Sequence, residues 1–475
     1  MAQGHMERLT GLDVSFLTNE KDGSYMHVGG CLIFEGPAPE YTDFADHIER
    51  RLAAIPRYRQ RLSFPPLNMG RPFWTDDPHF NIRYHVRHTA LPEPGSEEQL
   101  RNLTARLFSQ KLDRTKPLWE MYLVLGLEDN RFALINKTHH ALIDGVSGVD
   151  IATVLLDLNP VPSEPTEIEP WEPSPEPSSA ELAAMGAKDL AEAPIHLTTR
   201  GIRALTDPSS AIDKATEVVE GIAEVAWSFT NPTPDVPLNV QIGSHRRFTW
   251  CRCDLDDMKR IKNALGGTVN DVVLACSAGA LRRWLHGRGI RTEGLELSAQ
   301  VPVSIRAEDE HGELGNRIAA MRGPLPVYIE DPVRRLAVVR REMDGLKESK
   351  QALGAEASAR FNDFAPPTVL AQAARINFST RLFNLIITNV PGPQIPIYLM
   401  GREMQDIIPV AFLPERQALA IAIISYNGHL NFGLLADYDS MEDVEQIAEG
   451  IEISLLELLD AAKKAKRGKS PKEPV

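Results

Sequence analysis

Hydrophobic and polar residues follow two different periods along the chain, and each period predicts a different element. Residues 27–36 ("HVGGCLIFEG") form a compact apolar run typical of a strand, whereas residues 41–56 ("YTDFADHIERRLAAIP") repeat apolar positions at helical spacing. Residues 119–140 ("WEMYLVLGLEDNRFALINKTHH") predict two strands joined at a Glu-Asp-Asn turn. A helix is expected to follow over 148–159 ("GVDIATVLLDLN").

The second half of the chain shows the same mixture of periods. Strands are predicted over 247–255, 295–305, 385–393, 419–428 and 429–437, and helices over 269–287 and 331–348. Strands and helices therefore mix in both halves. This mixture predicts an α/β fold in which each half is a mixed sheet covered by helices.

One segment interrupts these patterns and indicates a domain boundary. From Asn159 the sequence "NPVPSEPTEIEPWEPSPEPSSAE" is rich in Pro, Glu and Ser, which favours an extended linker. A helical stretch is expected over 179–228, and "NPTPDVPLN" then breaks the chain again. Because 475 residues exceed what one core usually organises, we predict an N-terminal domain (1–159), a linker with bridging helices (160–235) and a C-terminal domain (236–475) with a basic tail.

Charge and cysteine content exclude some classes of protein. A formal net charge of -14 argues against a general nucleic-acid binder, which needs a concentrated basic face. The chain has 4 cysteines, too few and too scattered for a disulfide framework, so a reduced cytosol is expected. No apolar signal region or run of about 18 apolar residues is found, so we expect a protein that is soluble or bound at a membrane surface.

Candidate chemistry is concentrated in residues 135–150, "INKTHHALIDGVSGVD". Adjacent residues of an extended chain point in opposite directions, so only one of His139 and His140 can meet a substrate. A neutral imidazole can take a proton from an alcohol or amine near neutral pH. Asp144 could orient this base or pair elsewhere to hold the loop, and Gly145 predicts a tight turn after it.

Other kinds of site lack the residues that they need. A zinc site would need companion ligands at HExxH or His-x₃₋₅-His spacing, and the sequence has none. A serine hydrolase would need a Gly-x-Ser-x-Gly elbow, and the residues around Ser147 do not form one. We therefore predict a base that activates an acceptor substrate directly, without a protein nucleophile.

The motif "HHALIDG" resembles the HHxxxDG signature of the CoA-dependent acyltransferase superfamily, which includes chloramphenicol acetyltransferase and peptide-synthetase condensation domains. Further similarities are to the bacterial wax ester synthase/diacylglycerol acyltransferase family and extend over about residues 7–458. They comprise "ERLTGLDVSFL", "PLW" (Pro117, Leu118, Trp119), "ND" (Asn270, Asp271), "VPVSIR" ending at Arg306, "LGN" (Leu314–Asn316) and "NVPGP" (Asn389, Val390, Pro391, Gly392, Pro393).

The resemblance implies two chloramphenicol-acetyltransferase-like domains with a tunnel between them, entered by acyl-CoA and by an acceptor from opposite sides. His140 is then the general base, and no acyl-enzyme forms. The expected acceptor is diacylglycerol or a long-chain alcohol, so the product is triacylglycerol or wax ester. The resemblance implies acyl-CoA as co-substrate, no metal and no permanently bound cofactor. We expect a cytoplasmic protein that associates peripherally with membranes or lipid droplets and binds no nucleic acid.

For several motif residues the sequence leaves two interpretations open. The resemblance implies that Asp144 pairs with Arg306 to lock the loop, but Arg306 could be a surface residue. Asn270 and Asp271 begin a predicted helix, and the Asn270 amide could bond the thioester oxygen or cap this helix. Trp119 could shape a substrate pocket or pack in the core on the hairpin.

Two further groups are expected to have scaffold or charge roles. "NVPGP" is expected to form a rigid turn in which Gly392 is free to adopt a positive φ, at the domain interface or the tunnel. Arg334, Arg335, Arg340 and Arg341 share one predicted helix and could bind the CoA phosphates or simply be solvated. Two rival functions remain: a condensation-type enzyme with a carrier-protein thioester donor, and a non-catalytic lipid-binding protein.

Overall fold

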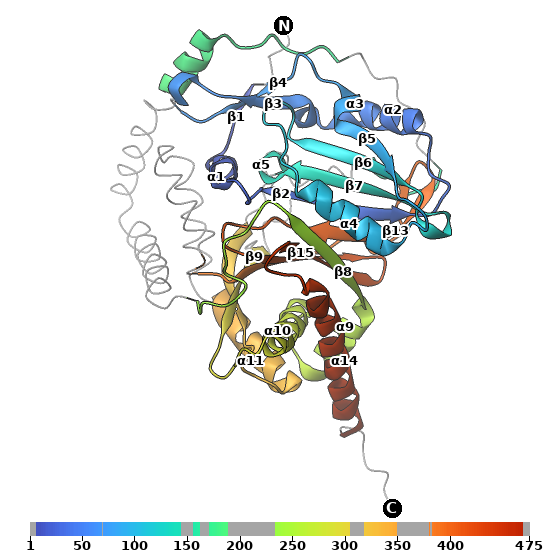
Figure 1. Ribbon diagram of the computed structural model, residues 1–475, viewed down its shortest axis with the longest axis vertical. Helices are drawn as coiled ribbons and strands as arrows, with labels where there is room; N and C mark the ends of the chain where they lie inside the picture. The colour runs from blue at the N-terminus through green and yellow to red at the C-terminus, as the bar shows by residue number, and fades with distance from the viewer. Residues whose placement is uncertain are drawn as a thin grey trace, which may run out of the picture.

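The computed structural model describes residues 6–68, 70–143, 155–161, 171–188, 233–304, 318–348, 380 and 382–468. Their strands form two six-stranded sheets and one three-stranded sheet, and helices pack on the large sheets (Figure 1). The small sheet consists of β1 (Glu7–Arg8), β4 (Phe73–Asp76) and β3 (Gln60–Ser63). This two-lobed α/β arrangement confirms the predicted fold class.

The first large sheet contains the strand that ends at the histidine pair. In spatial order it consists of β12 (Tyr398–Leu399), β13 (Arg402–Val410), β2 (His27–Phe34), β7 (Phe132–His139), β6 (Trp119–Leu125) and β5 (Val86–Ala90). β7 lies between β2 and β6 and pairs antiparallel with both. All eight residues of β7 are buried, so the end of this strand is held rigidly from both sides.

Among the described residues up to 143, five α-helices are present. They are α1 (Gly11–Asn19), α2 (Tyr41–Arg51), α3 (Ile82–His85), α4 (Glu97–Phe108) and the one-turn α5 (His140–Ile143). α1 begins with a capping box in which the Thr10 side chain accepts from the Asp13 backbone N–H and the Asp13 side chain accepts from that of Thr10. α5 continues directly from β7, so the chain changes from strand to helix between His139 and His140.

The second large sheet forms the other lobe. Its spatial order is β10 (Ile318–Leu325), β9 (Leu297–Ser304), β11 (Leu385–Val390), β14 (Leu419–Tyr426), β15 (His429–Asp437) and β8 (Arg246–Asp254). Its helices α9 (Leu255–Leu265), α10 (Val269–Gly287), α11 (Pro332–Glu348) and α14 (Val444–Gly468) lie on the side away from the first sheet (Figure 1). α10 packs between α11 and α14, and most of its residues are buried.

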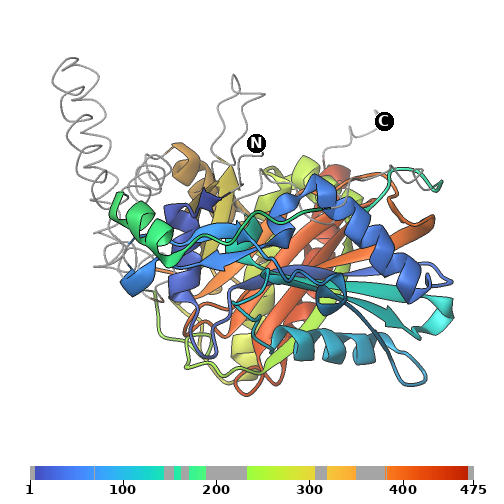
Figure 2. The same cartoon turned by 90° about the horizontal axis from the view of Figure 1, so that it is seen from above.

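The C-terminal part of the chain contributes two strands to the first sheet. After β11 in the second sheet, the chain crosses to the first sheet, adds β12 and β13 beside β2, and returns to the second sheet as β14 (Figures 1 and 2). β13 pairs antiparallel with β2 over Gly29–Phe34. A division of the chain at residues 159 and 235 therefore stays a prediction, because strands far beyond residue 235 complete the sheet of the N-terminal region.

Charged side chains join the lobes where α4 crosses β8. The Arg252 guanidinium on β8 donates to the Glu97 carboxylate on α4 at 2.9 and 3.2 Å, and to that of Asp406 on β13 at 2.7 Å. The Arg101 guanidinium lies 4.5 Å from the Trp250 ring centroid. Helix α4 and strands β8 and β13, which are distant in sequence, are thus held together at one junction.

Most of the predicted elements are confirmed. The strands expected in both halves correspond to β2, β6, β7, β8, β9, β11, β14 and β15, and the expected helices to α2, α10 and α11. Of the helix expected over 148–159, residues 148–154 lie outside the described residues. Of the helical stretch expected over 179–228, only residues 179–188 are described, and they are helical. All 4 cysteines are free and buried. Among the described residues no single helix is long and apolar enough to cross a membrane, and α9 with α10 qualifies only as a pair bent by 99°.

Candidate active site

The histidine pair lies where β7 ends and α5 begins, and its backbone is fixed on both sides. The His139 N–H donates to the Leu118 carbonyl at 2.9 Å, and the His140 N–H donates to the Met26 carbonyl at 2.8 Å. The two side chains then take different environments, as the alternation along a strand predicts. His139 is 1% exposed, whereas His140 is half-buried.

The His140 imidazole lies between two aromatic rings from distant parts of the chain. Phe16 of α1 stacks on it, with ring centroids 3.9 Å apart and planes inclined by 24°. Phe412, which follows β13, meets it edge-on at 5.5 Å and 90°. These contacts fix the plane of the imidazole at a partly exposed position, which is the arrangement that a general base requires.

His139 is held in one neutral form. The Ala141 backbone N–H donates to His139 Nδ1 at 3.1 Å, so this nitrogen is the acceptor and carries no proton. His139 Nε2 lies 3.8 Å from the Glu20 carboxylate. Burial is the main cause that lowers the pKa of His139 well below its usual value, and the nearby charge of Arg114 lowers it further. His139 is therefore a buried neutral support beneath His140.

Glu20 is the buried centre of a group of ionisable side chains, the Glu20 cluster, which consists of Glu20, His27, Lys111, Arg114 and His139. The Glu20 side chain is 1% exposed and receives a hydrogen bond from Arg114 Nε at 2.7 Å. His27 Nε2 lies 3.6 Å and Lys111 Nζ 3.9 Å from its carboxylate oxygens. Glu20 also ends α1, since its backbone N–H donates to the Phe16 carbonyl. The cluster therefore fixes the helix whose Phe16 stacks on His140.

The predicted motif "PLW" lies directly beside the histidines. The Leu118 carbonyl binds the His139 backbone, and Trp119 is the first residue of β6, paired with Thr138 on β7. The Trp119 indole N–H donates to the Tyr58 carbonyl at 2.7 Å, its ring stacks on His85 at 4.6 Å, and it is 1% exposed. This geometry fits packing on the hairpin, the second of the two interpretations of Trp119.

The motifs "ND" and "NVPGP" form a separate group on the second sheet. The Asn389 amide, near the end of β11, donates to the Asn270 side-chain oxygen on α10 at 3.4 Å. Asn270 does not cap α10, contrary to one interpretation from the sequence. Thr268 caps the helix, and Asp271 completes a capping box by accepting from the Thr268 backbone N–H at 2.7 Å.

Gly392 does not adopt the positive φ that a glycine allows there. A glycine is needed there for a different reason. A Cβ atom at residue 392 would lie 2.1 Å from the Ser425 carbonyl oxygen, and the Gly392 N–H donates to the Ser425 hydroxyl at 3.1 Å. Close backbone contact therefore fixes the turn, in which Pro391 and Pro393 are exposed. The chain leaves the second sheet for the first at this turn.

Several predicted residues cannot be placed, and one of the four arginines expected on a charged helix face is buried. Asp144, Gly145, Arg306 and Leu314–Asn316 lie outside the described residues. Arg335, expected among solvent-facing cations, is 2% exposed and donates to the Ala275 and Ile329 carbonyls at 3.1 and 3.0 Å. It is therefore a core residue and cannot share a phosphate site with the exposed Arg341. Within the described ranges no three His, Cys, Asp or Glu side chains gather where a metal ion could bind.

The buried histidines predict how stability depends on pH. Burial lowers the pKa of both His27 and His139 well below the usual value of about 6.5. Below that pH the unfolded chain binds protons that the folded protein does not. The free energy of unfolding is therefore expected to fall with decreasing pH, by about 1.4 kcal/mol per pH unit for each histidine.

Denaturant titrations between pH 7.5 and 5 measure this slope. The His27→Gln variant is expected to show a shallower slope than the unmodified protein, because one buried base is lost. His79→Gln, at an exposed histidine, serves as the matched control and is expected to leave the slope unchanged. An unchanged slope in His27→Gln would contradict this account.

The chain thus has two mixed sheets, a histidine at a strand-to-helix junction and two strands of the C-terminal region in the first sheet, and the comparisons with known proteins place it in the class of acyltransferases. Residues 9–273 match the family described as wax ester synthase/diacylglycerol acyltransferase catalytic domain, and residues 314–459 match the WS/DGAT C-terminal domain. The chain therefore belongs to the wax ester synthase/diacylglycerol acyltransferase family and is an acyltransferase, which confirms the assignment made from its motifs.

Relatives agree with this assignment over nearly the whole chain. A probable diacylglycerol O-acyltransferase of Mycobacterium tuberculosis, tgs1, is 32% identical over 472 residues, which cover 97% of each chain. The solved wax ester synthase/diacylglycerol acyltransferase of Marinobacter aquaeolei VT8 is 28% identical, with a TM-score of 0.66 and coverage of 96% of this chain and 100% of that one. The starter condensation domain of rhizomide synthetase, at 11% identity and a TM-score of 0.58 over 97% and 95% of the two chains, shares the fold.

Proposed function

We propose that this chain transfers a long-chain acyl group from acyl-CoA to the hydroxyl of diacylglycerol or of a long-chain alcohol. The product is triacylglycerol or wax ester, and free CoA is released. The relatives named above support the substrate class. The observation on which the mechanism depends is the position of His140, half-buried between Phe16 and Phe412 at the end of a rigid strand.

In this mechanism the His140 imidazole removes the proton of the acceptor hydroxyl. The hydroxyl oxygen attacks the thioester carbonyl, the carbon–sulfur bond breaks, and the sulfur of CoA takes up the proton that His140 holds. The acyl group passes directly between the two substrates, so no acyl-enzyme forms. General base assistance of this kind contributes about 10²–10⁴-fold in rate, and positioning of the two substrates contributes the remainder.

Release of CoA thiol tests the proposal directly. Purified protein is incubated with palmitoyl-CoA alone, with diacylglycerol or with hexadecanol, and thiol and ester are followed together. Thiol release is expected only when an acceptor is present, in equal amounts with ester and without an initial burst. Thiol release from a palmitoyl carrier protein but not from palmitoyl-CoA would establish a condensation-type donor instead. Lipid binding without any thiol release would contradict catalysis.

We also infer that the protein works at a lipid surface on the cytoplasmic side of the cell, because diacylglycerol and long-chain alcohols collect at interfaces with water. Flotation with vesicles that contain diacylglycerol tests this inference. The protein is expected to float with these vesicles and to be released by carbonate, as a peripheral protein is. Recovery in the soluble fraction at every lipid concentration would contradict it.

A further inference from the structure

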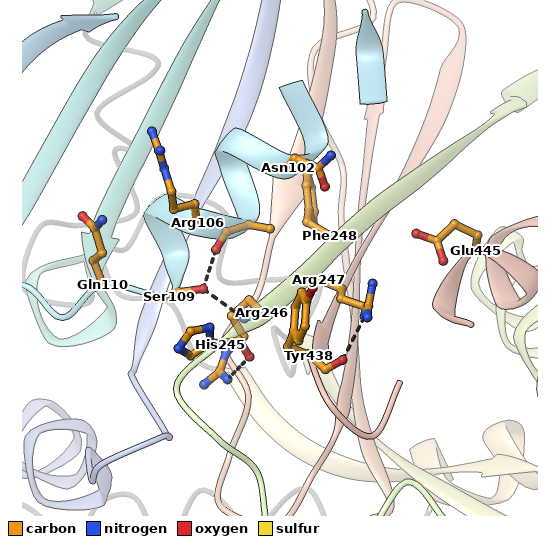
Figure 3. A pocket seen from close by; sticks show the side chains of 11 residues that line it. Asn102, Arg106, Ser109, Gln110, His245, Arg246, Arg247, Phe248, Tyr438 and Glu445 are labelled. Atoms are coloured by element: carbon orange, nitrogen blue, oxygen red, sulfur yellow. Dashed lines mark hydrogen bonds between the residues drawn. The ribbon is translucent and has the colours of Figure 1, made fainter. Parts of the chain in front are cut away.

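A cavity of about 390 Å³ lies where the end of α4 meets the start of β8 (Figure 3). Its walls come from three segments: α4 with the residues after it, β8 with the residue before it, and the region between β15 and α14. The lining residues are Asn102, Ala105, Arg106, Ser109, Gln110, His245, Arg246, Arg247, Phe248, Tyr438 and Glu445. Neither His139 nor His140 is among them. Small-molecule sites occupy about 300–1,000 Å³, so the cavity is large enough to bind part of a substrate.

The charge of this cavity is opposite to that of the whole protein. The chain has a formal net charge of -14, yet Arg106, Arg246 and Arg247 line the cavity and Glu445 is its one acidic lining residue. Figure 3 shows Arg106 on α4 on one side and Arg246 and Arg247 on β8 on the other. The concentration of cationic groups at one point of an acidic protein favours binding of an anion there.

Arg246 forms the floor of the cavity and is held by backbone groups. Its guanidinium donates to the Gly243 and His245 carbonyls at 2.7 and 2.9 Å, and to the Gly23 carbonyl. Burial lowers the pKa of Arg246 to about 10, so the side chain remains protonated at neutral pH. Arg246 thus contributes a fixed positive charge.

The cations near the rim retain donors for a ligand. Arg106 is exposed, and its side chain forms no hydrogen bond or ion pair with another described residue, whereas its backbone carbonyl accepts from the Ser109 N–H at 3.2 Å. Arg247 uses Nε to donate to the Tyr438 carbonyl at 2.8 Å and lies over the Tyr438 ring, so its two terminal nitrogens remain available. The negative end of α4 does not oppose an anion, because Lys137 Nζ donates to the Leu107 and Gln110 carbonyls at 3.1 Å.

Contacting side chains connect the cavity to the histidine pair. The Arg246 guanidinium lies 5.9 Å from the Tyr25 ring centroid, and the Tyr25 ring stacks on His27 at 5.5 Å. The His27 and His139 rings meet edge-on at 6.1 Å. Tyr25 and His27, at and just before the start of β2, therefore connect the cavity to His139.

We propose that this cavity binds the phosphate groups of the CoA part of the acyl donor. The proposal rests on the proposed function, because it assumes an acyl-CoA donor. Of the substrates of that reaction only CoA has phosphates, since diacylglycerol and long-chain alcohols are uncharged. The planar fork of an arginine matches a phosphate with two parallel hydrogen bonds, and the cavity presents arginines from both lobes.

Steady-state kinetics of the full chain with two donors test the proposal. Arg106→Glu is expected to raise KM for palmitoyl-CoA about tenfold, the loss that corresponds to one charge-assisted hydrogen bond. KM for palmitoyl-pantetheine, which has the thioester but no phosphate, is expected to stay unchanged. Arg260→Glu, at an exposed arginine on α9, is the matched control and is expected to change neither value. Equal changes for both donors, or no change for either, would overturn the proposal.

Direct binding separates a failure of this proposal from a failure of the proposed function. Adenosine 3',5'-bisphosphate is titrated into the protein by calorimetry, which needs no turnover, and binding is expected to weaken about tenfold in Arg106→Glu. Absence of binding to the unmodified protein would overturn the phosphate site even if the enzyme is active. Vesicles of phosphatidylglycerol and of phosphatidylcholine form the second arm. Weaker binding of Arg106→Glu to phosphatidylglycerol vesicles alone, with normal nucleotide binding, would assign the cavity to a lipid headgroup instead.

Discussion

Replacement of His140 by alanine is expected to lower kcat for palmitoyl transfer by about 10²–10⁴-fold, because it removes the group that we propose takes the acceptor proton. KM for palmitoyl-CoA should change little, since the role proposed for the imidazole is proton transfer and not binding of the donor. The thermal unfolding midpoint should also change little, because the side chain is half-buried and contacts two rings that remain packed on other residues. Rates of thiol release at saturating acceptor provide the measurement.

His88 offers a matched control for this substitution. It is an exposed imidazole that packs on the Tyr41 ring, with centroids 4.2 Å apart, and it lies on β5 at the edge of the same sheet. His88→Ala is expected to retain the activity of the unmodified protein. If His140→Ala kept more than about one tenth of kcat, the base would have to be another group and the mechanism above would be wrong.

Replacement of Glu20 by alanine is expected to reduce the free energy of unfolding by about 2–4 kcal/mol, because it leaves the cations around it without an anion. This loss of stability should be smaller than for an ion pair with both side chains buried, because the Arg114 side chain is 31% exposed and can be solvated by water. We also expect kcat to fall, because the Glu20 cluster ends α1 and so fixes Phe16 against His140. Chemical denaturation and thiol release measure the two effects.

Glu415→Ala is the matched control for a carboxylate paired with a cation. Glu415 pairs with Lys21, the residue after Glu20, but both side chains are exposed, so its loss should cost no more than about 1 kcal/mol. Glu20→Gln keeps the shape and removes the charge, and its loss of stability should lie between the two. Equal stability of Glu20→Ala and Glu415→Ala would show that the Glu20 cluster contributes nothing to the fold.

The sequence predicted the elements whose partners are close along the chain. β6 and β7 form a hairpin, which two apolar runs joined by a short polar turn are sufficient to identify. The histidine pair lies at the end of its second strand. The "PLW" motif follows from the same hairpin, since β6 begins at Trp119. Helix α10 was predicted for a similar reason, because nineteen residues of helical spacing need no distant partner to be recognised.

The features that the sequence did not predict depend on distant contacts. β13 contains Glu403, Asp406 and Pro409, and becomes a strand because β2, far earlier in the chain, presents a free edge to it. Glu20 resembles an ordinary exposed acid at the end of a helix. Its burial depends on Arg114, 94 residues away, and on two histidines that only the folded sheet brings near. The spacing of residues along the sequence does not indicate such long-range pairs.

The strand exchanged between the lobes limits how this enzyme can be divided. A fragment that stops before residue 398 would leave the backbone N–H and C=O groups of β2 unpaired along Gly29–Phe34, and such an open edge recruits other chains into aggregates. A fragment that starts after the linker would contain β13 with no sheet to join. Separate expression of either half is therefore unsuited to this architecture, because the first sheet is complete only when both halves are present.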